Sequence, residues 1–178
     1  GYNNLGSAWK DLGDAKKAVD YHEKSLAINL QVFCDRHPNI ARDYNNLGSA
    51  WKDLGDAKKA VDYHEKSLSI ILQVFGDRHP NVAIGYNNLG SAWKDLGDAK
   101  KAIDYHEKSL SIILQVFGDR HPNVATGYNN LGLAWKHLGD AKKAIEYSEK
   151  ALAIFTDIYG PDHPTTKGVR DDLSIVKK

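Results

Sequence analysis

Apolar and polar positions alternate along this chain with the period of an α-helix, and the whole pattern repeats. From Pro80 to Leu96, apolar and small residues recur at steps of three and four, which predicts a helix buried on one side. The same spacing predicts a second helix from Ala99 to Phe117 that is apolar to its last two residues, which we expect to be buried. Gly97 ends the first helix and Asp98 is a good N-cap for the second, so the two form an antiparallel pair.

This helix pair belongs to a unit that recurs along the chain. Each copy opens with a tyrosine followed by two asparagines, at Tyr2, Tyr44, Tyr86 and Tyr128. The second and third copies differ at only two positions, Val61/Ile103 and Ile84/Thr126. A fixed period of this size is typical of a solenoid, in which each supersecondary unit covers the apolar face of its neighbour.

We divide the chain into the segments of one array: repeat 1 (1–43, first helix truncated), repeat 2 (44–85), repeat 3 (86–127), repeat 4 (128–163) and a capping helix (164–178). In the last segment Arg170 replaces the tyrosine and aspartates replace the asparagine pair, while Val169 and Leu173 keep one face apolar. This composition is typical of a helix that covers the last repeat and presents charge to water. We therefore expect an all-α fold.

The charge and cysteine content narrow the classes of function. With 24 Lys and Arg against 23 Asp and Glu, the net charge is +1. This balance argues against general nucleic-acid binding, which needs a concentrated basic face. No apolar run approaches the ~18 residues of a membrane-spanning helix, and no signal-peptide pattern opens the chain. We therefore expect no membrane partner. Cys34 is the only cysteine, so we expect no internal disulfide and a reducing cytoplasmic location.

The polar residues form no catalytic or metal-binding pattern. The eight histidines mostly recur with the repeat, so equivalent side chains are spread along the stack and do not converge within ~2–2.1 Å of one point, as metal ligands must. The Gly-Asp turns lack the Lys-Ser/Thr that follows a phosphate-binding loop. No serine or cysteine has a base and a third orienting group beside it. We expect no metal, no cofactor and no enzymatic activity.

The residues of each copy resemble a known family. All four copies share the pattern that repeat 2 shows as Tyr44…Leu47-Gly48…Trp51…Gly55-Asp56…Ala60…Leu68. This pattern resembles the tetratricopeptide repeat. The usual unit has about 34 residues, and the longer unit with its GDRHPNVA junction is similar to kinesin-light-chain-type repeats. Over nearly the whole chain, the resemblance implies a right-handed superhelical solenoid of antiparallel helix pairs that serves as a protein-interaction scaffold.

The resemblance also implies a binding groove, because in tetratricopeptide arrays the first helices line a concave face. Transferred to this sequence, the groove residues are Arg42, Asn45, Ser49, Lys52, Asn87, Ser91, Lys94, Thr126, Asn129, Leu133 and Lys136. An asparagine side chain offers both a donor and an acceptor, so a row of them can hold an extended peptide backbone. Helix layers lie roughly 10 Å apart and an extended chain covers ~3.3 Å per residue, so each repeat addresses about three peptide residues.

Differences between the copies fall partly on the same face, which favours a role in binding. Arg42, Ile84 and Thr126 occupy equivalent positions, and Leu133 and His137 replace the serine and aspartate of the preceding copy. The alternative is that these polar side chains only solvate an exposed helix face.

Other functions stay open beside the peptide-binding scaffold. Nearly identical repeats favour head-to-tail self-association into a structural array, because such contacts are heterologous and propagate. The near-identity of the copies, and a chain that starts at Gly1 inside the first helix, also fit an engineered or excised array. A further resemblance, to the sensor end of NOD-like signalling ATPases, implies a sensor segment.

Three departures between copies, or from the family, carry local expectations. Cys34 stands where the other copies have glycine after the second helix. If that position needs the left-handed conformation, a side chain costs roughly 1 kcal/mol there. Two positions on the second helices carry polar residues where the family prefers an aromatic residue or alanine, namely His22, His64 and His106, and Ser25, Ser67 and Ser109. We expect these side chains to find hydrogen bonds or to lie near the surface.

Overall fold

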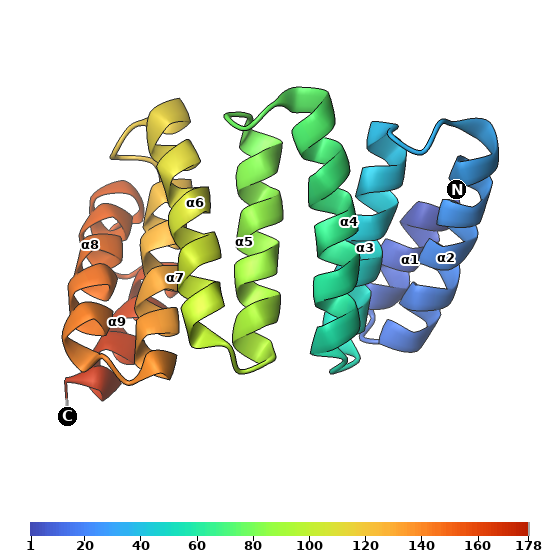
Figure 1. Cartoon of the computed structure of the whole chain (residues 1–178). Coiled ribbons are helices and arrows are strands. Elements are labelled where there is room, and N and C mark those ends of the chain that lie inside the picture. Colours follow the sequence, from blue (N-terminus) through green and yellow to red (C-terminus); the bar gives the residue numbers. More distant parts are fainter. Residues whose placement is uncertain (178) are drawn as a thin grey trace.

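The computed structural model describes residues 1–177, and within that range the chain forms nine α-helices side by side (Figure 1). Four antiparallel pairs and a final helix follow one another: α1 (Tyr2–Asp11) with α2 (Ala15–Val32), α3 (Pro38–Asp53) with α4 (Ala57–Phe75), α5 (Pro80–Asp95) with α6 (Ala99–Phe117), α7 (Pro122–Leu138) with α8 (Ala141–Tyr159), and α9 (Pro164–Val176). Lys178, the last residue of the predicted capping helix, lies outside the described residues. The predicted all-α fold is confirmed.

Side-chain caps fix where the helices begin. At the start of α6, the carboxylate of Asp98 accepts a hydrogen bond from the backbone N–H of Lys101 at 3.0 Å, as predicted for an N-cap. Helices α3, α5, α7 and α9 begin with a proline in their first turn, and here the cap is a histidine. Nδ1 of His79 accepts from the backbone N–H of Asn81 at 3.1 Å, and the other junctions have equivalent bonds. The periodic histidines of the loops are thus helix caps.

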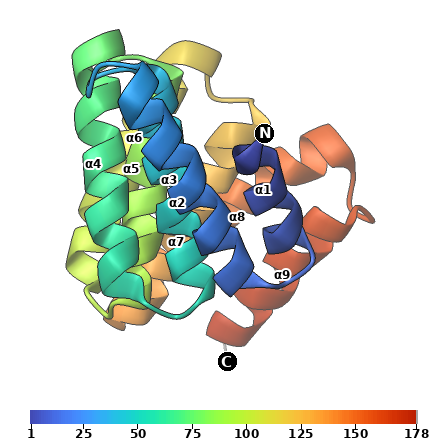
Figure 2. The ribbon, with the colours of Figure 1, turned by 90° about the vertical axis from the view of Figure 1, so that its right-hand side faces the viewer.

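The helix pairs stack so that each second helix lies between two first helices, its own and that of the next pair. The first helices also contact one another, α1 with α3, α3 with α5, and α5 with α7. They therefore lie on the inner side of the curve, and the second helices lie on its outer side. Viewed from the N-terminal end, successive pairs are turned relative to one another (Figure 2). This arrangement is the predicted superhelical solenoid.

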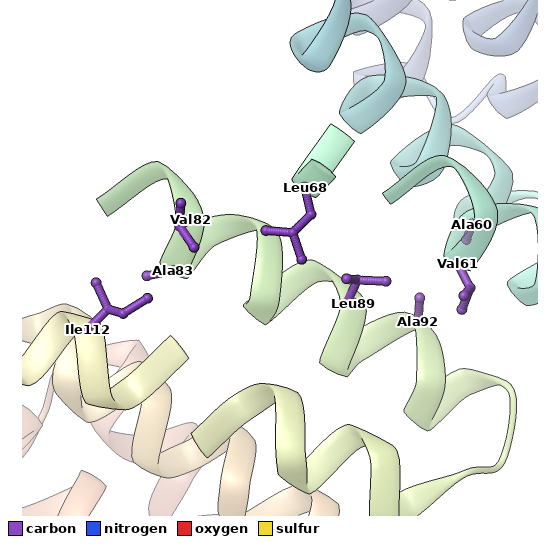
Figure 3. Close-up of a cluster of buried hydrophobic side chains, with 8 residues drawn as sticks. All are labelled: Ala60, Val61, Leu68, Val82, Ala83, Leu89, Ala92 and Ile112. Atoms are coloured by element: carbon purple, nitrogen blue, oxygen red, sulfur yellow. The ribbon is translucent and has the colours of Figure 1, made fainter. Parts of the chain in front are cut away.

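The hydrophobic core runs along the stack between neighbouring helices. Around α5, Leu89 is fully buried and lies between Leu68 and Val61 of the preceding α4, whereas Ile112 of α6 lies beside Ala83, nearer the start of α5 (Figure 3). Burying a side chain of this size stabilises the fold by about 1.5–3 kcal/mol. Each repeat therefore depends on its neighbour for part of its core, as expected of a solenoid.

A histidine ring fills the space beside a glycine in each of the first three pairs. A Cβ added to Gly90 would lie 2.7 Å from atoms of the His106 ring, and Gly48 has the same relation to His64. Both histidines are only 2% exposed, and their Nδ1 atoms have no hydrogen-bond partner among the described residues. The expectation that these histidines bond or lie near the surface is wrong, because the glycine on the facing helix leaves a space that the ring fills as a core side chain.

The serines of the second helices follow the expectation. Ser67 donates a hydrogen bond to the backbone carbonyl of Ala41 at 2.7 Å, and Ser109 donates to that of Ala83 at 2.8 Å. Ser25 donates instead to the carboxylate of Asp43 at 3.1 Å. These buried hydroxyls are therefore all satisfied.

The last turn of the second helices is more exposed than the sequence predicts. Val116 and Phe117 are 43% and 40% exposed, although we expected both to be buried. The ring of Phe117 stacks on that of His121 in the loop, with centroids 4.4 Å apart. A loop covers this turn less completely than a helix would, so apolar side chains remain accessible there.

The loop at Cys34 avoids the strain that we expected. Gly76 and Gly118 have φ angles of 77° and 75°, whereas no residue other than glycine has a positive φ in the described part of the chain. Helix α2 ends at Val32, one residue earlier in its repeat than α4, which ends at Phe75. Helix α2 is therefore one residue shorter at its C-terminal end, and its cap residue Phe33 is extended, without the positive φ of Gly76.

Helix α9 covers α8 at the C-terminal end. Val169 and Leu173 are 5% and 6% exposed, and Val169 packs with Phe155 of α8. Arg170 and Asp171 on the other side of α9 are exposed. The helix thus buries one face and presents charge to water, as expected of a cap.

Candidate functional site

The first helices α1, α3, α5 and α7 form a continuous surface on the inner side of the curve, which we call the inner face. The predicted residues Asn45, Asn87 and Asn129 lie half-buried at equivalent positions of α3, α5 and α7. Because neighbouring first helices are in contact, the stack brings these asparagines into one row.

Asparagine side chains also link the first helices to one another. Each bond joins an Nδ2 atom to the Oδ1 atom of the preceding repeat: Asn46 to Asn3 at 2.7 Å, Asn88 to Asn45 at 2.8 Å, and Asn130 to Asn87 at 2.7 Å. The oxygens of Asn45 and Asn87 are therefore used within the solenoid. Their Nδ2 groups donate to no other group among the described residues, so the inner face presents amide donors.

The row ends differently at Asn129. Helix α9 carries Asp172 where the earlier first helices carry the donor asparagine, and a carboxylate has no N–H to give. The described residues therefore provide no inter-helix bond to Asn129. Its whole amide is available to a ligand.

The hydroxyl groups predicted for the site are partly used on their own helices. Ser49 donates to the carbonyl of Asn45, and Thr126 donates to the carbonyl of Pro122, both at 3.1 Å. Ser91 and Leu133 are half-buried on the inner face. These side chains shape the surface more than they offer hydrogen bonds to a ligand.

The inner face becomes more basic toward α7. Lys52 and Lys94 are half-buried, and the ammonium group of Lys94 lies 4.0 Å from the carboxylate of Asp95. In α7 the acidic position holds His137, so Lys136 has no neighbouring carboxylate at the equivalent place. Both side chains are exposed. The inner face therefore carries less compensated positive charge at this end.

Two equivalent hollows open where the first helices begin. The first, of about 330 Å³, is lined mainly by Arg42, Asn45, Ile71, Phe75 and Ile84. The second, of about 300 Å³, is lined mainly by Ile84, Asn87, Ile113, Phe117 and Thr126. Each residue of the second hollow lies one repeat after its counterpart in the first. Both hollows combine an apolar floor from the second helix with an asparagine of the inner face.

The sequence analysis missed the apolar half of these hollows. We expected Phe117 to be buried because it continues the helical pattern, yet Phe117 and the equivalent Phe75 are 40% and 39% exposed. Arg42, Ile84 and Thr126, which differ between copies, line the same hollows. The available signal was an apolar position that stays the same before each loop and a position that varies after it.

The lysines of the inner face contribute to a low pKa of the buried histidines beneath them. Burial, followed by the charge of Lys52, lowers the pKa of His64 to about 4. Burial, followed by the charge of Lys94, lowers the pKa of His106 to about 4. These imidazoles are therefore neutral near pH 7, and the positive charge of the inner face comes from lysine and arginine.

Residues 1–177 also bear on two other kinds of site. No group of three His, Cys, Asp or Glu side chains there is arranged to hold a metal ion. None of the helices in this range is both long and apolar enough to cross a bilayer.

Comparison with known proteins matches the repeat pattern to one family. A tetratricopeptide repeat model matches residues 1–70, 44–92 and 86–137, and a second tetratricopeptide repeat model matches residues 124–165. No curated protein sequence matches the chain.

Solved structures share the fold at low sequence identity. A kinesin-light-chain-type protein of Podosopora anserina with nearly identical TPR-like repeats is 21% identical to this chain, with a TM-score of 0.84. The match covers 98% of this chain and 83% of the Podosopora anserina protein. A point variant of that protein is also 21% identical, with a TM-score of 0.85, and the match covers 98% of this chain and 82% of the variant. BtubC (BKLC) from P. vanneervenii is 24% identical, with a TM-score of 0.84 over 97% and 68%.

Proposed function

Because this chain belongs to the tetratricopeptide repeat family, whose fold is generally a protein-interaction scaffold, we propose that it binds an extended peptide segment of a partner protein along the inner face. Members of this family are typically non-catalytic, and we assign no reaction to this chain. We place the scaffold in the cytoplasm, where the exposed thiol of Cys34 would stay reduced.

The observation that carries the proposal is the repetition of the two hollows. Each combines an apolar floor, from Ile71 and Phe75 or from Ile113 and Phe117, with an asparagine wall. Helix layers lie roughly 10 Å apart, and an extended chain advances ~3.3 Å per residue. A peptide with apolar side chains about three residues apart would therefore fill both hollows at once.

The asparagine row supports binding of the peptide backbone. Asn45 and Asn87 direct their oxygens into the solenoid, so the groups left for a ligand are amide N–H donors. Backbone carbonyls are the acceptors that every peptide supplies at regular spacing. Recognition through this row depends little on side chains, and the hollows would provide the selectivity.

The test uses peptides selected from a random-sequence display library against the wild-type chain. Replacing Asn45, Asn87 and Asn129 by alanine should weaken a selected peptide at least about tenfold, since each net hydrogen bond contributes about 0.5–1.5 kcal/mol. The matched control replaces the exposed amides of the second helices, Gln31, Gln73 and Gln115, by alanine. Affinity that falls equally in both triple variants, or in neither, would place the binding site elsewhere.

Asn129 separates binding from stability. The described residues provide no inter-repeat bond to Asn129, whereas replacing Asn45 or Asn87 removes one. Asn129→Ala should therefore weaken a peptide that reaches α7 and leave the urea midpoint unchanged. A lower midpoint without a change in affinity would mean that the asparagines serve only the stack.

A second candidate function is head-to-tail self-association, favoured by the near-identity of the repeats, because contacts between such units are heterologous and can propagate. Leu47, Leu89 and Leu131 are 0% exposed beneath the preceding second helix, and Leu5 is the equivalent residue of the first repeat. Helix α9 packs on α8, so this association would require displacement of α9. Sedimentation equilibrium decides it: a monomer at every concentration excludes the array, and assembly that Leu5→Glu abolishes supports it.

A further inference from the structure

One junction of the stack contains a buried polar contact where the two following junctions are apolar. Asp43 of α3 is 0% exposed, and its carboxylate accepts hydrogen bonds from Asn29 of α2 at 2.5 Å and from Ser25 at 3.1 Å. The next two copies have Gly85 and Gly127 in place of Asp43, and Ile71 and Ile113 in place of Asn29. Two of the few differences between the first and second copies therefore face each other.

The same pair of positions distinguishes the last junction as well. Phe155 of α8 and Val169 of α9 occupy the places of Asn29 and Asp43, and they pack together in one core cluster. The facing residues are thus asparagine and aspartate at the first junction, isoleucine and glycine at the second and third, and phenylalanine and valine at the fourth. The two end junctions are thus chemically distinct, and the two middle junctions are alike.

Near-identical repeats need such a distinction, because the helices themselves do not discriminate between neighbours. Helices α4 and α6 differ only at Val61/Ile103. A chain that loops out one repeat, or that exchanges repeats with a second copy, would bring these helices onto equivalent surfaces with little penalty. Exchange of identical elements between chains is a low-cost route to wrong dimers.

Wrong pairing at the first junction would leave polar groups buried without partners. If α3 took the place of α5 or α7 at a later junction, Asp43 would face Ile71 of α4 or Ile113 of α6. The nearby Ser67 and Ser109 already donate to backbone carbonyls. If α2 packed against α5 or α7, the amide of Asn29 would face a glycine. In addition, a Cβ at Gly85 would lie 2.9 Å from Leu68, so that position has no room prepared for a carboxylate.

From this geometry we propose that Asn29 and Asp43 form a register key, which ties α2 to α3 and penalises any other inter-repeat junction of these two helices, within one chain or between two copies. A buried charge left without its partner strongly destabilises the fold that contains it. A single buried polar pair at a helix interface is a known way to specify register, at some cost in stability. The key thus acts on which repeats become neighbours.

The first experiment measures the coupling between the two side chains by urea unfolding. Asn29→Ile should lower the folding equilibrium constant by about 100-fold, because it removes a donor from a buried carboxylate. Adding Asp43→Gly should recover most of that loss, because the junction then matches the next two. If the losses of the two single variants simply add in the double variant, the pair is not coupled and the proposal fails. Should Asn29→Ile not fold, a folded double variant still demonstrates the coupling.

The second experiment measures specificity on refolding. The wild type and the double variant N29I/D43G are each refolded from urea at high concentration. Light scattering after size exclusion then gives the dimer fraction. The double variant should form several-fold more dimer than the wild type. An equal dimer fraction in the wild type and the double variant would overturn the proposal.

Discussion

The buried histidines make the stability of this solenoid sensitive to acid. His64 and His106 are 2% exposed and their Nδ1 atoms have no hydrogen-bond partner in the described range. Burial, with smaller contributions from the charges of Lys52 and Lys94, lowers the pKa of each imidazole to about 4. An unfolded histidine has a pKa of about 6.5, so between these values the unfolded chain binds protons that the folded chain excludes.

The sign and size of the effect follow from linkage. A folded-state pKa below the unfolded value means that stability is complete above about pH 6.5 and falls as the pH drops toward 4. At pH 5 each histidine should reduce the free energy of unfolding by about 2 kcal/mol, or about 4 kcal/mol for the two together. A loss of this size is a large part of the 5–15 kcal/mol that stabilises a typical domain.

Urea titrations at pH 7 and pH 5 provide the assay. The double variant His64→Phe/His106→Phe keeps a ring beside Gly48 and Gly90 but cannot bind a proton, so it should lose about 4 kcal/mol less than the wild type between the two pH values. As a control, Gln73→Ala/Gln115→Ala on the exposed side of the same helices should keep the wild-type pH dependence. Equal losses in the wild type and the phenylalanine variant would refute the idea that these imidazoles stay neutral in the folded state.

Two further predictions concern glycines that the fold uses for different reasons. Gly90→Ala places a Cβ 2.7 Å from the His106 ring. It should lower the free energy of unfolding by about 1–3 kcal/mol through overpacking, and an unchanged urea midpoint would show that the ring moves aside at no cost. Gly76→Cys puts a side chain at a φ of 77°. It should cost about 1 kcal/mol in the same assay, whereas a variant as stable as the wild type would show that this loop adopts the path at Cys34 freely.

The sequence alone determined the helices and their stacking. The ends of α6 at Ala99 and Phe117 agree with the prediction, because caps and apolar periodicity are local properties that each segment carries by itself. The near-identity of the copies then implied identical packing, since each unit must bury its apolar face against the next. The row of asparagines on one face was expected from the resemblance to tetratricopeptide repeats.

The tertiary structure decided which groups remain for a ligand and which pair within the stack. Helical periodicity identifies a face but not the residue opposite it. The bond from Asn88 to Asn45 and the burial of His106 therefore had no local signal. The bond depends on contact between the first helices of successive pairs, and the burial depends on the glycine that faces the ring within its own pair. The contact between Asn29 and Asp43 shows the same limit, because two polar substitutions in different helices become compensating only when packing places them face to face.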